Sequence, residues 1–237
     1  MKSTLQASDF DRAFATERAQ IYPAVSDLEA RMGYGIARER LECAARTLAC
    51  PVKVNPPNWQ HGRVLYAALM KYLEGRSEPV NVFDCGTAKG FSALCMAFAL
   101  ADAKASGKVH SVDVIDPNSM VPRNSILDLE RPRSVREFVL PWQESDRIEF
   151  HWSTGINWLK SHPERVHFAF VDGKHSEGIV REEAELLAAR QQQGDVSIFD
   201  DMQIPGVHAA VVRIESDYSV ELLIPKRERQ YAVATRR

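Results

Sequence analysis

The chain has 237 residues, of which 45% are hydrophobic and 26% are charged, as in a globular protein with a proper core. Thirty basic against 32 acidic residues give a net charge of −2, which argues against nucleic acid or an anionic membrane as the main partner. No apolar stretch approaches the roughly 20 residues of a membrane-spanning helix. The first residues lack the apolar segment of a signal peptide, so we expect a cytoplasmic protein.

The N-terminal quarter reads as helical. Residues 9–50 alternate charged and apolar residues at a spacing of three to four, which is typical of amphipathic helices. Prolines interrupt this pattern within residues 50–62, and a helix resumes over residues 59–75. We therefore expect residues 1–58 to form a helical cap, which serves the substrate site or joins two copies of the chain in a homodimer.

From residue 80 onward, short apolar strands alternate with helices. The expected strands are VNVFD (80–84), KVHSVDV (108–114), DRIEFHW (146–152), RVHFAFVD (165–172) and DVSIFD (195–200). The expected helices are residues 89–107, 155–161 and 177–194. Such alternation predicts a parallel sheet covered by helices on both faces.

The last two expected strands, residues 218–225 and 229–237, are joined by a short connection, which predicts an antiparallel hairpin at the sheet edge. The predicted fold class is thus α/β: a doubly wound, mostly parallel, seven-stranded sheet of Rossmann-like type with a C-terminal antiparallel hairpin. Residues 59–237 form this domain. Within it, residues 114–145 are long for one crossover, so they read either as a lid or substrate insertion or as a plain helix with an irregular entry.

The segment FDCGTAKGFSA (83–93) combines a strand end, a turn with glycines and a helix start. Gly86 and Gly90 allow the backbone to approach a ligand, and the amide groups of the helix start can face a polar group. The spacing differs from the Gly-x-Gly-x-x-Gly pattern of dinucleotide-binding proteins. Asp84 precedes the turn, and Asp113 ends the next strand, where a carboxylate can accept both hydroxyls of a ribose.

This combination resembles the class I S-adenosylmethionine (SAM)-dependent methyltransferases, over roughly residues 60–237. The resemblance implies SAM as cofactor and a contact near the adenine from the loop after the third strand. The cofactor-binding residues that it implies are Asp84, Gly86, Thr87, Gly90, Ser92, Asp113, Ser153 and Asp172.

Carboxylates also end the fourth and fifth expected strands. Asp172 follows one, and Asp200 and Asp201 follow the next. Since open α/β sheets bind ligands at the carboxyl ends of their strands, we expect these three groups to converge on one crevice. Oxygen ligands suit a hard divalent cation, Mg²⁺ first, with Ca²⁺ or Mn²⁺ as alternatives. The competing interpretation is that one aspartate caps a helix and another pairs with an arginine.

The pattern of Asp172, His175, Asp200 and Asp201 resembles the metal-dependent small-molecule O-methyltransferases of the catechol and macrolide-sugar types. These enzymes carry a general base three residues after the aspartate of the fourth strand. The base is lysine in the catechol type and histidine in the sugar type, so His175 favours a sugar-like or polyol acceptor. Lys174 lies beside it, which leaves the identity of the catalytic base open between these two residues.

The sequence therefore predicts a metal-dependent O-methyltransferase that acts on a hydroxyl of a sugar or another small diol metabolite. Two alternatives stay open. One is a hydroxylase-like or lyase enzyme on the same scaffold, and the other is a non-catalytic nucleoside-binding subunit.

Overall fold

The computed structural model describes residues 5–53 and 57–237. Residues 1–4 and 54–56, which include the start of the predicted helical cap and part of the predicted proline-rich break, lie outside the described residues. The strands are β1 Val80–Cys85, β2 Gly107–Asp113, β3 Ile148–Trp152, β4 Phe168–Val171, β5 Val196–Phe199, β6 Tyr218–Lys226 and β7 Arg229–Arg236. Each predicted strand is confirmed, with boundaries that differ by a few residues.

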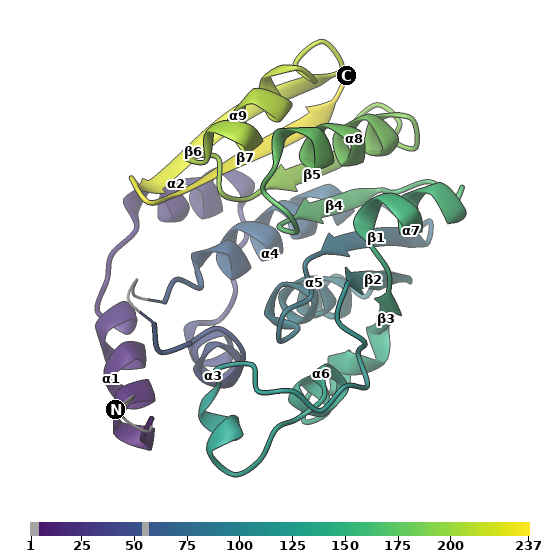
Figure 1. Ribbon diagram of the computed structural model, residues 1–237. Helices are drawn as coiled ribbons and strands as arrows, with labels where there is room; N and C mark the ends of the chain where they lie inside the picture. The colour runs from purple at the N-terminus through teal and green to yellow at the C-terminus, as the bar shows by residue number, and fades with distance from the viewer. Residues whose placement is uncertain (1–4, 54–56) are drawn as a thin grey trace.

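The helices divide into an N-terminal group and a group that alternates with the strands (Figure 1). The first group is α1 Ala7–Arg18, α2 Pro23–Met32, α3 Arg38–Leu48 and α4 Gln60–Leu73. The second group is α5 Phe91–Asp102, α6 Val135–Val139, α7 Gly155–Ser161, α8 Glu177–Ala188 and α9 Pro205–Val212. Among the helices of the described ranges, none has the length and apolarity that crossing a bilayer requires.

The seven strands form one sheet in the order β3-β2-β1-β4-β5-β7-β6. Strands β1 to β5 run parallel, and β7 pairs antiparallel with both β5 and β6. The predicted fold class, including the C-terminal hairpin, is confirmed. The order reverses direction at β1 and β4, so the carboxyl ends of these neighbouring strands border the crevice in which such sheets bind ligands.

Helices cover both faces of the sheet. Successive residues of each strand point to opposite faces, and the apolar side chains on each face pack against a layer of helices. Val82 and Phe168 pack with α2, α3, α4 and α5 on one face. Phe83 and Ala169 pack with α7, α8 and α9 on the other. All four side chains are fully buried. The two layers of helices therefore hold the strand ends rigidly at a common edge.

Two regions differ from the simplest expectation. Helix α9 begins at Pro205 directly after a short turn, in a segment for which the sequence pattern predicts no particular element. The connection 114–145 holds only short helical pieces, namely α6 and 3₁₀ turns at Ile126–Leu129 and Gln143–Arg147. It is therefore not a plain helix. Ser125 in this connection donates a hydrogen bond to the carbonyl oxygen of Thr47, which ties the segment to α3.

Candidate functional site

The loop after β1 is pressed against the loop after β4. Gly86 and Gly90 have φ angles of +99° and +85°, and Ala88 has a φ of +47°. A Cβ atom on Gly86 would lie 2.2 Å from the carbonyl oxygen of Asp172. Only glycine combines that backbone conformation with such a close approach. The turn predicted from the two glycines therefore lies directly beside the first aspartate of the predicted metal set.

Asp84 is fully buried beneath this loop. Its Oδ2 atom accepts a 2.5 Å hydrogen bond from the Ser111 hydroxyl, which also lies 2.8 Å from the hydroxyl of Thr87. Its Oδ1 atom has no hydrogen-bond partner among the described residues. Burial raises the pKa of Asp84 to about 6. A buried carboxyl group, one oxygen of which is bonded to Ser111, thus lies at the base of the loop.

Asp113 and Ser153 lie side by side at the ends of β2 and β3. The Asp113 carboxylate accepts hydrogen bonds from the backbone amides of Ala88, at 3.0 Å, and Ile115, at 2.9 Å. The Ser153 amide donates to the Asp113 carbonyl oxygen at 2.9 Å. Asp113 therefore connects the loop after β1 to the neighbouring strand ends.

A lysine that the sequence reasoning did not single out lies in the same loop. Lys89 is 8% exposed, and its Nζ atom donates to the carbonyl oxygen of Arg123 at 3.2 Å. Burial lowers the pKa of Lys89 to about 8. Arg123 in turn donates to the carbonyl oxygen of Ala88 at 2.6 Å. These bonds fasten the connection 114–145 to the loop.

Three of the residues singled out at the ends of β4 and β5 lie together: Asp172, His175 and Asp201. His175 Nε2 lies 3.3 Å from Asp172 Oδ1 and 3.3 Å from Asp201 Oδ2. The ligand atoms of Asp172, His175 and Asp201 all lie within 4.8 Å of one another. The hydrogen bond with Asp172 and the charge of Asp201 raise the pKa of His175, and partial burial opposes them.

Asp200 has a different environment from Asp201. It is 1% exposed, and its Oδ1 atom accepts a 2.6 Å hydrogen bond from the Asp201 amide. Burial and the nearby Asp172 raise the pKa of Asp200 well above its usual range. Its remaining oxygen pairs with Arg229, so Asp200 is not part of the group of ligand atoms and fits the competing interpretation of an aspartate paired with an arginine.

Arg229, at the start of β7, contacts all three aspartates. Besides its bond to Asp200, its guanidinium lies 3.5 Å from Asp201 Oδ1 and 3.8 Å from Asp172 Oδ2. Sequence reasoning missed this residue, because the basic C-terminal segment reads as a solvated edge. The predicted C-terminal hairpin could have indicated it, because a last strand that pairs antiparallel with β5 begins at the carboxyl end of β5.

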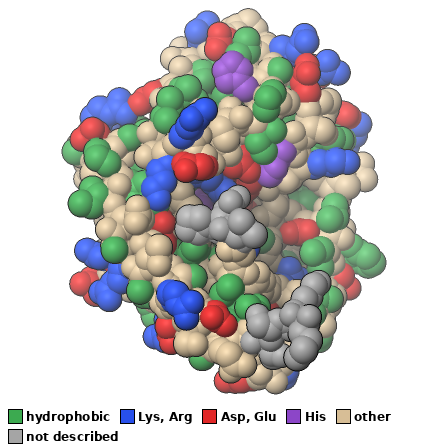
Figure 2. Space-filling view, turned by 60° about the vertical axis from the view of Figure 1, so that its left-hand side comes forward, with side chains coloured by type: hydrophobic (Ala, Val, Ile, Leu, Met, Phe, Trp, Pro, Cys, Tyr) green, Lys and Arg blue, Asp and Glu red, His purple; other side chains and the backbone are tan. Residues whose placement is uncertain are grey.

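One cavity of about 510 Å³ joins the loop after β1 to this cluster. Figure 2 shows acidic, basic and histidine side chains close together on this side of the molecule. The lining includes Gly86, Thr87, Ala88, Lys89, Ser92, Asp172, Asp201 and Arg229. His61 lines it too, in parallel stacking with Phe170 at 5.9 Å. Neither predicted base is part of the lining: Lys174 has an exposed side chain, and His175 adjoins the cavity through its contacts with Asp172 and Asp201.

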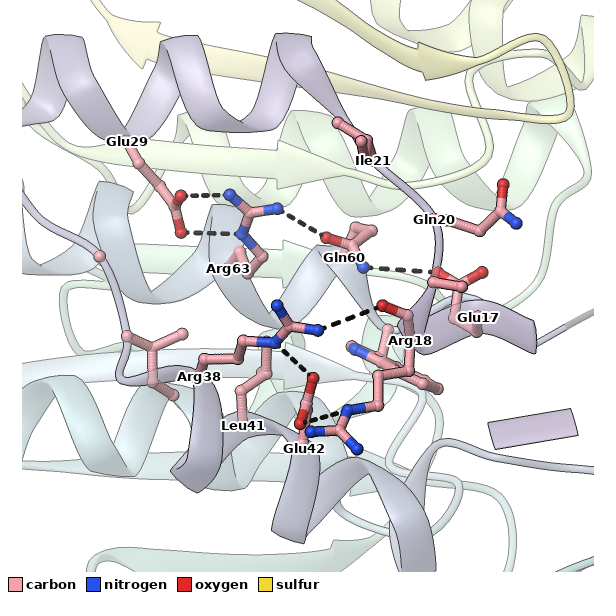
Figure 3. A pocket seen from close by; sticks show the side chains of 14 residues that line it. Glu17, Arg18, Gln20, Ile21, Glu29, Arg38, Leu41, Glu42, Gln60 and Arg63 are labelled. Carbon is pink, nitrogen blue, oxygen red and sulfur yellow. Dashed lines mark hydrogen bonds and ion pairs between the residues drawn. The ribbon is translucent and has the colours of Figure 1, made fainter. Parts of the chain in front are cut away.

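A second cavity, of about 540 Å³, lies among the N-terminal helices (Figure 3). Its charged side chains mostly pair with one another: Arg63 Nε donates to Glu29 at 2.9 Å, and Arg38 Nε donates to Glu42 at 2.7 Å. These mutual ion pairs leave little capacity for a charged ligand. Although slightly larger, this cavity holds none of the predicted site residues, so we assign the candidate site to the cavity at the strand ends.

Several solved structures, two of them described as methyltransferases or methylases, share the fold at low sequence identity. An O-methyltransferase from Bacillus cereus, in complex with S-adenosylhomocysteine (SAH), is 13% identical with a TM-score of 0.56, over 96% of this chain and 100% of that one. The cofactor-bound protein Rv0187 from MTB is 15% identical with a TM-score of 0.55, over 99% of both chains. An rRNA methylase from Streptococcus thermophilus is 14% identical with a TM-score of 0.51, over 73% and 95%.

No curated protein matches the sequence. A family described as "Methyltransferase domain" does match it, over residues 83–202. This match covers just over half of the chain and runs from the end of β1 to the residue after Asp201. It thus includes the loop after β1, Asp113 and the cluster at the ends of β4 and β5. The chain therefore belongs to this family of methyltransferase domains.

Proposed function

We propose that this chain is a SAM-dependent O-methyltransferase that acts on a hydroxyl of a sugar or another small diol, assisted by a divalent cation. One observation carries the proposal: the glycine-containing loop borders the same cavity as Asp172 and Asp201, and His175 lies against both of these aspartates. A methyl donor and an acceptor hydroxyl can therefore meet there. Family membership favours methyl transfer over the hydroxylase, lyase and non-catalytic alternatives.

The residues around the loop fit SAM, which supplies an electrophilic methyl group on a sulfonium sulfur. Asp84, buried at the end of β1 with an Oδ1 atom that has no hydrogen-bond partner among the described residues, would support the loop that holds SAM. Asp113 ends β2, where its carboxylate would accept the ribose hydroxyls after releasing its bonds to backbone amides. Ser153 lies next to Asp113, where it would contact the adenine ring of SAM. The SAH complex of the Bacillus cereus relative supports this assignment.

His175 is the better candidate for the general base. Its Nε2 atom lies between two carboxylates, which stabilise the positive charge that the imidazole gains on taking a proton. The Lys174 side chain, by comparison, is exposed. The proton of the acceptor hydroxyl would move to His175 as the acceptor oxygen bonds to the methyl carbon and the bond from carbon to sulfur breaks, leaving SAH.

The carboxylates fit a hard divalent cation, for which Mg²⁺, Ca²⁺ and Mn²⁺ are the candidates. Asp172 and Asp201 would hold it, and Asp200 would orient Asp201 through the bond to its amide. A bound cation would stabilise the negative charge that develops on the acceptor oxygen.

A second candidate is methyl transfer without a metal. The contacts of Arg229 with Asp172, Asp200 and Asp201 favour it, because the guanidinium supplies positive charge where a cation would otherwise be needed. In this mechanism the aspartates, held by Arg229, orient His175. The rate of methyl transfer then depends on His175 as base and on the positioning of the acceptor.

The test is transfer of a labelled methyl group from SAM to a panel of vicinal diols and their monohydroxy analogues. The protein is stripped of metal with EDTA and assayed with and without added Mg²⁺. Transfer to diols that depends on Mg²⁺ supports the first candidate, and undiminished transfer in EDTA supports the second. Transfer to nitrogen or carbon acceptors, with none to hydroxyls, would refute both.

A further inference from the structure

A second group of potential metal ligands lies on the sheet, away from the candidate site. His110 on β2 is the register partner of Glu149 on β3, and His151 follows two residues after Glu149. Residues two apart on a strand share a face. The three side chains therefore project together from the edge of the sheet, on the face covered by α7, where both histidine rings pack near Trp158.

The spacing of these groups matches a coordination shell. His110 Nδ1 lies 3.2 Å from His151 Nε2 and 3.5 Å from Glu149 Oε2, and all three ligand atoms lie within 4.8 Å of one another. Two ligands at about 2.0–2.1 Å from a tetrahedral Zn²⁺ are separated by roughly 3.3 Å. One imidazole hydrogen bond would also account for the 3.2 Å separation between the histidines, but not for the presence of a third ligand atom, from Glu149, within the same group.

We propose that His110, Glu149 and His151 form a binding site for a transition-metal cation of the Zn²⁺ class. Two imidazoles and one carboxylate are a donor set typical of Zn²⁺. Mg²⁺, which prefers oxygen ligands, has little affinity for it. The Glu149 side chain is 47% exposed and that of His110 is 17% exposed, so a cation can enter from solvent and keep a water as fourth ligand.

The charge and protonation of the site agree with this assignment. Burial lowers the pKa of His110, and burial together with His110 lowers that of His151 to about 4, so both rings are neutral at pH 7 as ligands must be. Glu149 Oε1 lies 3.7 Å from Lys108 Nζ, an exposed ion pair that a cation displaces readily.

A bound cation would clamp the edge strand β3 to β2. The carboxyl ends of these two strands carry Asp113 and Ser153, so the clamp would also steady that side of the candidate site. The expected consequence is a higher midpoint of thermal unfolding with Zn²⁺, because a ligand that binds only the folded state stabilises it.

The test is calorimetric titration with Zn²⁺ in excess Mg²⁺, with every chain carrying His175→Ala so that the carboxylate cluster offers only oxygen ligands, which Mg²⁺ occupies. One Zn²⁺ per chain is expected to bind. His110→Ala and His151→Ala should weaken binding by more than about 100-fold, and Glu149→Gln by at least about tenfold. His208→Ala, at an exposed position on α9, is the matched control and should bind as the unchanged chain does.

Thermal unfolding separates binding from misfolding. Without Zn²⁺, the Glu149→Gln variant should have nearly the same midpoint temperature of unfolding as the unchanged chain. Added Zn²⁺ should raise this midpoint much more in the unchanged chain than in the variant. Absence of Zn²⁺ binding in excess Mg²⁺ would overturn the proposal. So would Zn²⁺ binding that survives in both histidine variants.

Discussion

Arg229 bonds to the buried carboxylate of Asp200 at the point where β7 begins beside the end of β5. The two residues are 29 positions apart, and the antiparallel pairing of β7 with β5 brings them together. The last strand thereby contributes a positive charge to a cluster that otherwise consists of carboxylates and one histidine. This contact also fixes Asp200 as a support for Asp201.

Replacement of Arg229 by Gln should destabilise the fold at pH 7 by about 3 kcal/mol, because it leaves buried carboxylates without their partner. Urea unfolding measures the change. Mg²⁺ should restore part of the lost stability if a cation binds at Asp172 and Asp201. Arg227→Gln, at an exposed position just before β7, is the control and should change the unfolding free energy by less than about 0.5 kcal/mol. Equal effects of the two variants would contradict the central role of Arg229.

The pKa of His175 should lie above 6.5 in the metal-free protein, since the bond with Asp172 and the charge of Asp201 favour the protonated ring. Because this pKa is raised, the stability that the protonated ring contributes is present below pH 6.5 and is lost as the pH rises through the folded-state pKa. An NMR titration of the imidazole measures the midpoint. Added Mg²⁺ should lower it under the metal-dependent proposal, and a midpoint below 6.5 without metal would contradict the assigned contacts.

His175→Ala should lower kcat by about 10²–10⁴-fold while SAH binding changes little, because the base acts on the acceptor and not on the cofactor. Lys174→Ala is the neighbouring control and should keep nearly full activity. The reverse result, with a lysine variant that is inactive and a histidine variant that turns over normally, would transfer the role of base to Lys174.

Asp84→Asn should change how stability depends on pH. The pKa of Asp84 rises from 3.8 to about 6 on folding, so the folded state holds the proton more tightly and stability falls as the pH rises from about 4 to 6. Relative to the variant, the unchanged chain should lose on the order of 2 kcal/mol over this interval. Urea unfolding at pH 4.5 and 7 measures it, with the exposed Asp27→Asn as control. Parallel pH profiles for Asp84→Asn and the unchanged chain would rule out this burial effect.

Gly86→Ala should destabilise the protein far more than Gly33→Ala. Both glycines have positive φ, but a Cβ on Gly86 meets the Asp172 carbonyl oxygen at 2.2 Å, whereas a Cβ on Gly33 meets nothing within 4 Å. Gly33→Ala should lower the free energy of unfolding by about 1 kcal/mol through backbone strain. Gly86→Ala should lower it by about 3 kcal/mol or more, and it should also weaken the binding of SAH. Chemical denaturation measures both changes. Equal losses of stability in the two variants would show that the loop after β1 does not press against the loop after β4.

The sheet was predictable from the sequence because its strands are short apolar runs that alternate with helices. The hairpin of β6 and β7 was predictable from the short connection between two apolar runs. Helix α9 has an almost uniformly apolar sequence, so periodicity gives no signal there. The connection 114–145 was open between two interpretations, and its short helical pieces depend on side-chain caps at Ser125 and Ser134.

The site was predictable where it depends on strand ends and was missed where it depends on pairing partners. Asp172, Asp200 and Asp201 follow apolar runs directly, so the rule on ligand sites at carboxyl ends brings them together. Arg229 joins them only through antiparallel register. His110 and His151 lie 41 residues apart, and their proximity follows from the register of β2 and β3, which sequence spacing alone does not give.

Calorimetric titration with SAH, compared between the unchanged chain and Asp113→Ala, tests the central claim most directly. We predict micromolar binding by the unchanged chain and a loss of at least about tenfold in the variant, because a buried or partly buried carboxylate that accepts ligand hydroxyls contributes more than about 1.4 kcal/mol. Absence of binding by the unchanged chain, with and without Mg²⁺, would contradict the cofactor assignment and with it the proposed methyl transfer.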